Sequence, residues 1–67
     1  MKSITVNRIL ELIRENNLTL KKFAENVGVS QGNITDWKTG RARPSVESLQ
    51  KISRAYGVQL EWLTGDC

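Results

Sequence analysis

Residues 20–37 read LKKFAENVGVSQGNITDW, and this stretch decides the fold. Its first apolar side chains recur at i, i+3, i+4 and i+7, the spacing of one face of an α-helix; they are Leu20, Phe23, Ala24 and Val27. Gly28 follows directly, where a helix commonly ends in the left-handed conformation that glycine adopts without a steric penalty. The stretch therefore predicts a short amphipathic helix over residues 19–27, with Thr19 as its N-cap.

A second helix is expected just after this glycine. A valine fills the corner and Ser30 is a good N-cap, so the helix is predicted over residues 30–38. Its inner face carries Ile34 and Trp37, while Ala24 is small where two helices crossing at a steep angle press closest. The arrangement is a helix-turn-helix, a motif whose second helix is offered to the DNA major groove.

Three further helices are predicted around this unit. Apolar residues at helical spacing predict one over residues 4–16, which a pair of asparagines ends. After a loop with two arginines, a proline and the N-cap Ser45 introduce a helix over residues 45–56, which a glycine ends. A last helical turn is predicted over residues 59–63. No strand pattern, repeat or low-complexity segment occurs, so the fold class is all-α, a compact domain of five helices.

The inner faces of these helices should meet in one small core. On the first helix the inward residues are expected to be Val6, Ile9, Leu10 and Ile13, flanked by Leu12. On the fourth they are expected to be Val46, Leu49, Ile52 and Tyr56, with Ala55 beside them. The centre is expected to consist of Phe23, Ile34, Trp37, Leu49 and Ile52. Truncating one central side chain would cost a few kcal/mol out of a total of about 5 kcal/mol.

The whole pattern resembles the lambda-repressor-like, or Cro-type, helix-turn-helix domains of phage repressors and bacterial regulators. The resemblance includes the turn residues, the loop Gly40-Arg-Ala-Arg-Pro-Ser45, and the following residues Leu49, Ile52, Ala55, Tyr56 and Trp62. It covers nearly all of the 67 residues in the order of the family. It implies that residues 1–67 form a single helix-turn-helix DNA-binding domain of a regulator from a bacterium or a phage.

Four outward residues of the second motif helix are the candidates for reading bases: Gln31, Gly32, Asn33 and Asp36. Glutamine and asparagine can pair bidentately with adenine, and Asp36 can accept a hydrogen bond from cytosine or hold a neighbouring side chain. Gly32 lacks a side chain where the family commonly carries a contact residue. It allows close approach of the backbone at a cost of about 1 kcal/mol relative to alanine. The alternative is an ordinary solvated helix surface.

Eight residues are the candidates for binding DNA phosphates: Thr19, Lys21, Lys22, Thr35, Lys38, Thr39, Arg41 and Arg43. The last basic residues belong to a run over residues 37–46 that contains no acid. The first members lie at the amino end of a helix, which attracts phosphate through its N–H groups and dipole. The family usually places a polar residue after that cap, and this chain has Leu20 instead. The alternative for the lysines and arginines is solvated surface.

Composition agrees with a small nucleic-acid-binding domain. Ten Lys and Arg against seven Asp and Glu give a net charge of +3, and the isoelectric point is near 9.4. No basic-then-apolar leader and no long apolar run occur, so the expected location is the cytoplasm and no membrane partner is expected.

The chain has no histidine and one cysteine, Cys67, so neither an internal disulfide nor a zinc site is expected. Three interpretations of Cys67 remain open: a terminal thiol without a role, a disulfide between two chains, or a position at which a longer protein was cut. No cofactor or small-molecule ligand is expected.

A dimer is expected on DNA, because one helix reads too few base pairs to select one site in a genome. The last segment is more apolar than its own packing needs, which indicates a dimer contact through Val58, Leu60, Trp62 and Leu63. The predicted function is a sequence-specific transcriptional regulator of double-stranded DNA, a repressor on a near-palindromic operator.

Two other classes of function compete with this one. The first is a protein-binding module with the same fold, such as an antitoxin or a regulator subunit. The second is an enzyme, which is not expected because the sequence has no histidine, no embedded cysteine, no phosphate-binding glycine loop and no clustered acids.

Overall fold

The computed structural model describes residues 4–65, and these form five α-helices and no strand. The helices are α1 (Ile4–Glu15), α2 (Leu20–Val27), α3 (Gln31–Thr39), α4 (Val46–Tyr56) and α5 (Leu60–Thr64). Each begins and ends within one residue of the range predicted from the sequence, and the all-α fold is confirmed. The possible roles of Cys67 lie outside the described residues.

The ends of the helices follow from their capping residues. Thr19, Ser30 and Ser45 each accept a hydrogen bond from the backbone N–H three residues on, at 3.1, 3.2 and 3.1 Å. A glycine in the left-handed conformation ends each of α2, α3, α4 and α5. α1 ends instead at two asparagines, the second of which has a φ of 54°. Local sequence thus determines where these helices start and stop.

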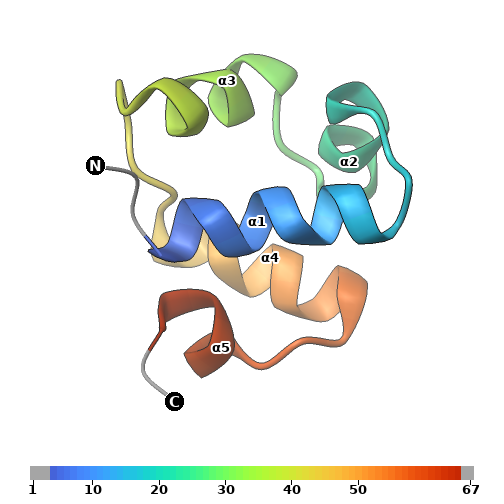
Figure 1. Cartoon of the computed structure of the whole chain (residues 1–67), viewed down its shortest axis with the longest axis vertical. Coiled ribbons are helices and arrows are strands. Elements are labelled where there is room, and N and C mark those ends of the chain that lie inside the picture. Colours follow the sequence, from blue (N-terminus) through green and yellow to red (C-terminus); the bar gives the residue numbers. More distant parts are fainter. Residues whose placement is uncertain (1–3, 66–67) are drawn as a thin grey trace.

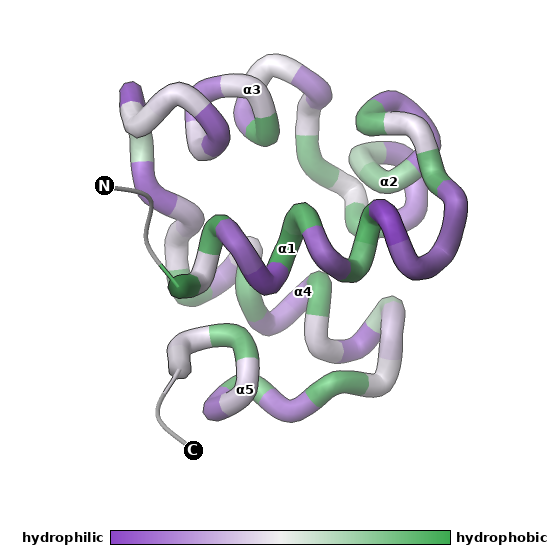
Figure 2. The backbone as a smooth tube through the Cα atoms, in the orientation of Figure 1, coloured by the Kyte–Doolittle hydropathy of each residue, from purple (hydrophilic) through white to green (hydrophobic). Residues whose placement is uncertain are grey.

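The core is apolar throughout and draws on every helix. Its buried members are Val6, Ile9, Leu12, Ile13, Phe23, Ala24, Val27, Ile34, Trp37, Leu49, Ile52 and Leu63. All five residues predicted for the centre are among them. Figure 2 shows that the tube of α3 is mostly hydrophilic, in contrast to the alternating colours of α1. α3 therefore contributes little to the core beyond Ile34 and Trp37.

The inner face of α1 differs from the prediction in one respect. Leu12 is buried, whereas Leu10, which was expected to point inward, is only half-buried. α5 packs on α1 with Trp62 against Arg8, and Leu12 lies one turn after Arg8 on the same flank. A helix offers two flanks beside its central stripe, and its own sequence does not say which flank a neighbour will cover.

The inner face of α4 is also narrower than predicted. Leu49 and Ile52 are buried, but Val46 is 65% exposed and Ala55 is exposed as well. A spacing of three residues drifts around a helix by about 60° at each step. Val46 and Ala55 consequently lie on opposite flanks of the buried stripe, outside the core.

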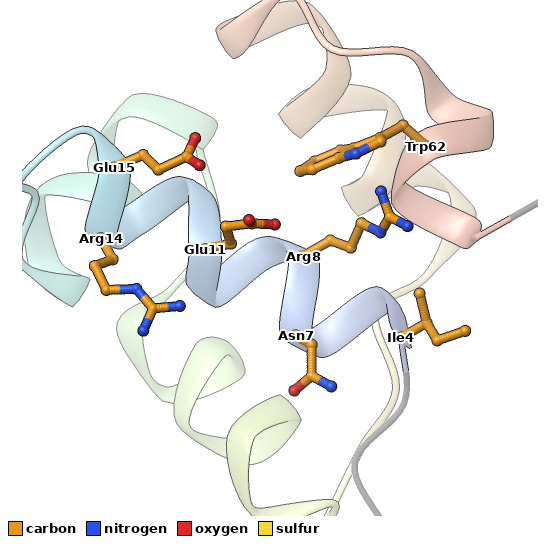
Figure 3. Close-up of a pocket in the computed structure, with 7 residues that line it drawn as sticks. All are labelled: Ile4, Asn7, Arg8, Glu11, Arg14, Glu15 and Trp62. Atoms are coloured by element: carbon orange, nitrogen blue, oxygen red, sulfur yellow. The ribbon is translucent and has the colours of Figure 1, made fainter. Parts of the chain in front are cut away.

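The helix-turn-helix lies at one side of the molecule and α5 at the other. Figure 1 shows α3 and α5 on opposite sides of α1, and the close-up in Figure 3 shows the same order. The last helix packs on both α1 and α4. Its Leu63 is completely buried, and its Trp62 lies against Arg8 of α1. This arrangement leaves the outer face of α3 uncovered.

Candidate nucleic-acid interface

The turn between α2 and α3 is built from backbone hydrogen bonds that converge on one carbonyl. The N–H groups of Gly28 and Val29 both donate to the carbonyl oxygen of Ala24, at 2.8 and 3.1 Å. Gly28 adopts a φ of 87°, which lets the chain reverse within one residue. Ser30 then caps α3 through its bond with Asn33 N–H. The turn fixes the direction in which α3 leaves α2.

The orientation of α3 follows from its two buried residues, Ile34 and Trp37. Successive side chains are about 100° apart around a helix. The residues roughly opposite the buried pair are therefore Gly32, Thr35, Asp36 and Thr39. Gln31 and Lys38 lie on one flank of this outer face and Asn33 lies on the other. The four residues predicted to read bases thus lie on the outer face of α3 or on its flanks.

Gln31, Gly32 and Asn33, in the first turn of α3, are exposed, whereas Asp36 is half-buried. The backbone carbonyl of Asp36 accepts hydrogen bonds from Arg41 N–H at 2.9 Å, Ala42 N–H at 3.3 Å and the Thr39 hydroxyl at 3.3 Å. These bonds bend the chain after Gly40 and hold the arginine loop against the end of α3. The backbone carbonyl of Asp36 therefore anchors the loop that follows α3, a structural role that sequence reasoning missed.

Two threonine hydroxyls on α3 are turned back onto the helix. Thr35 Oγ1 donates to the carbonyl oxygen of Gln31 and Thr39 Oγ1 donates to that of Asp36, both at 3.3 Å. For either hydroxyl to donate to a phosphate, its side chain has to rotate. As they stand, these side chains offer their methyl groups and an accepting oxygen.

Exposed basic residues lie at and beyond the end of α3 and also occupy the first turn of α2, the other helix of the motif. Lys38, Arg41 and Arg43 are exposed at the C-terminal end of α3, and Lys21 and Lys22 are exposed in the first turn of α2. Within residues 4–65 the only ion pair joins Lys51 Nζ to Glu47 Oε1 at 3.7 Å, on α4. The five cations named above thus carry no acidic partner from the described chain.

A further basic residue lies on the flank of α1 that faces α3. Figure 3 shows Arg14 pointing to that side, whereas Glu15 points to the side on which α5 lies. Both residues line a shallow groove along α1 that reaches Trp62, where the Arg8 guanidinium carbon lies 4.8 Å from the ring centroid. Arg14 is not among the residues predicted from the sequence. The sequence of α1 alone does not tell which of its flanks faces α3, because that depends on which flank α5 covers.

This geometry defines a helix-turn-helix domain, and comparison with known proteins gives its family. The helix-turn-helix family matches residues 9–63, which is most of the chain. The chain belongs to this family, in its Cro and C1 type. No helix within residues 4–65 is long and apolar enough to cross a membrane. In the same part of the chain, no group of three or more His, Cys, Asp or Glu side chains could hold a metal ion.

Similar relatives carry the names of transcriptional regulators. An uncharacterized HTH-type transcriptional regulator from Haemophilus influenzae is 45% identical over 42 residues, which are 63% of this chain and 18% of that protein. The HTH-type transcriptional activator BcrR from Enterococcus faecalis is 35% identical over 60 residues, 88% of this chain and 29% of that protein. The HTH-type transcriptional regulator DdrOP3 from Deinococcus deserti is 37% identical over 51 residues, 76% of this chain and 40% of that protein.

The chain spans less than half of the length of each of these relatives. The likeness therefore concerns the helix-turn-helix domain and not the rest of those proteins. No solved structure matches the chain significantly.

Proposed function

We propose that this domain binds double-stranded DNA with α3 in the major groove and regulates transcription from there. One observation carries the proposal: a polar, uncovered helix face is continued by exposed cations that form no ion pair with the described residues. Polar side chains are suited to base edges, and unpaired cations are suited to phosphates. Membership in the helix-turn-helix family supports the same placement of α3.

The contacts divide between the two ends of α3. Gln31 and Asn33, in its first turn, would read base edges together with the outer face at Gly32 and Asp36. Phosphates would bind Lys38, Thr39, Arg41 and Arg43 beyond the other end of α3, Thr35 after rotation of its hydroxyl, and Thr19, Lys21 and Lys22 at the start of α2. The Thr19 hydroxyl already accepts from Lys22 N–H at 3.1 Å and retains its own hydrogen for a phosphate oxygen.

Two chains would bind one near-palindromic operator, with their α3 helices about 34 Å apart. The partner contact would be made by Val58, Leu60 and Trp62, which are half-buried in the single chain. Leu63 was predicted in this contact, but it is completely buried in the core of its own chain, so it is excluded. The domain would repress by occupying DNA that a polymerase needs, in a bacterial cytoplasm.

Salt dependence of binding tests the proposal. The logarithm of DNA affinity should fall linearly with the logarithm of salt concentration, and each lost phosphate contact should reduce the slope by about 0.9. We expect Arg41→Ala with Arg43→Ala to reduce it by about 1.8 in fluorescence anisotropy titrations.

Arg54→Ala is the control for loss of an exposed positive charge outside the proposed contact; it removes one such charge from the last turn of α4, against two in the double variant. It should leave the slope as in the parent. Weak, salt-insensitive binding by the parent would contradict the proposal and favour the protein-binding alternative. An unchanged slope in the double variant would remove the two arginines from the contact.

A further inference from the structure

Gly32 is the one glycine of residues 4–65 that the local geometry does not require. The other four, Gly28, Gly40, Gly57 and Gly65, end helices with φ between 66° and 87°. Gly32 instead lies inside α3 and has no positive φ. A Cβ atom built on it would meet only Ser30 Oγ at 3.9 Å, an ordinary van der Waals distance. Alanine would therefore fit this position and would favour the helix.

Gly32 lies on the exposed side of α3. Gly32 points about 170° away from the mean direction of Ile34 and Trp37, so it is the outermost point of the first turn. With Gln31 and Asn33 on either side, the missing side chain leaves a notch in the face that the proposed function directs at DNA.

The neighbours of Gly32 one helical turn on are Thr35 and Asp36, and Thr35 supplies an apolar group. Thr35 lies three residues on, on the same face of α3, and its hydroxyl donates to the carbonyl oxygen of Gln31 at 3.3 Å. In this rotamer, rather than in the rotated one that would donate to a phosphate, Thr35 offers its methyl group beside an accepting oxygen. A small apolar group therefore fits between the Gly32 backbone and Thr35. In the major groove, the apolar group that projects from a base edge is the thymine C5 methyl.

We propose that Gly32 admits a thymine methyl group, so that α3 selects a T·A pair opposite its first turn. This inference rests on the proposed DNA binding. In it, specificity comes from an absent side chain: a methyl on the base and a methyl on the protein compete for the same space. Removing one should make room for the other.

The test is an exchange of methyl groups between protein and DNA. Selection from random duplexes supplies the operator, and each thymine of a half-site is then replaced in turn by deoxyuridine. At one position the parent should lose about fourfold in affinity, the worth of one buried methyl. Gly32→Ala should bind the thymine operator more weakly than the parent does, and deoxyuridine at that position should restore its binding. The same variant should melt about 4 °C higher than the parent.

Gln50→Ala is the matched control, because it also introduces alanine at an exposed helical position, on α4. It should keep the deoxyuridine profile of the parent. The inference is overturned if Gly32→Ala has the same ratio of thymine to deoxyuridine affinity as the parent at every position. It is also overturned if the parent binds the operator and prefers thymine nowhere. Failure of the parent to bind any duplex would instead overturn the proposed function.

Discussion

At the scale of single residues, Tyr56 is the side chain that joins α4 to the helix-turn-helix. Its ring stacks on Phe23 with the centroids 5.3 Å apart and the planes 12° from parallel. Its hydroxyl accepts a hydrogen bond from Asn26 Nδ2 at 3.1 Å. Both partners lie on α2, the helix from which α3 takes its direction. Tyr56 therefore contributes to the position of α3 without touching it.

Substitution of Tyr56 should separate its two contacts. Tyr56→Phe keeps the stack and loses an exposed hydrogen bond, so we expect a loss of about 0.5 kcal/mol in the free energy of unfolding. Tyr56→Ala also loses the ring and should cost about 3 kcal/mol. Urea denaturation measures both. In the Tyr56→Phe background, Asn26→Ala should cost nothing further, because the hydroxyl that accepts the Asn26 hydrogen bond is already absent. Equal losses for the two Tyr56 variants would show that the stack contributes nothing.

At the scale of helices, the sequence predicts where a helix begins and ends better than it predicts which side of the helix is buried. Ser30 and Gly28 act through atoms within a few residues of themselves, so their effect is readable locally. Which flank of a helix is covered depends on a neighbour that is distant in sequence. Leu10 was expected to point inward on α1 and is only half-buried, whereas the flanking Leu12 is buried. Leu63, expected at a dimer contact, is buried in its own chain.

The candidate interface shows the same division. The position of Gln31 on α3 follows from the spacing of Ile34 and Trp37, and sequence reasoning placed it on the outer face. The inward turn of the Thr35 hydroxyl and the hydrogen bonds that the Asp36 carbonyl accepts depend on side-chain rotation and loop path. Residue spacing carries no signal for either.

The end of α5 offers a prediction about how one helix is held on another. Gly65 has a φ of 81°, and a Cβ atom there would lie 2.9 Å from Ile4 Cγ2 on α1. Gly57 has a φ of 66° and nothing within 4 Å of its Cβ position. Gly57→Ala should therefore cost about 1 kcal/mol for the left-handed backbone alone.

Gly65→Ala should cost more than Gly57→Ala by about 1 kcal/mol, because the new methyl also presses on α1. Thermal melts of both variants measure the difference. The Ile4→Ala background should remove most of the excess, since it deletes the atoms that are pressed. Equal melting temperatures for the two glycine variants would contradict a close contact between the end of α5 and α1.

At the scale of the whole molecule, the opposite positions of α3 and α5 bear on how two copies can act together. A contact made through the last segment would not cover α3 in either copy, because α1 lies between the two (Figure 1). The half-buried residues Val58, Leu60 and Trp62 are all in or beside α5. An isologous contact there would bring together two such segments and leave both proposed DNA-binding faces exposed.

A charge placed in this segment should separate dimerisation from folding. Leu60→Glu puts a carboxylate into the proposed contact, so we expect the parent to sediment as a dimer on its operator and the variant as a monomer with at least tenfold weaker DNA binding. Gln59→Glu adds the same charge at the adjacent exposed residue and should behave as the parent. Melting curves check that both variants fold. A parent that stays monomeric, alone and on DNA, would show that this segment makes no dimer and that each half-site is bound independently.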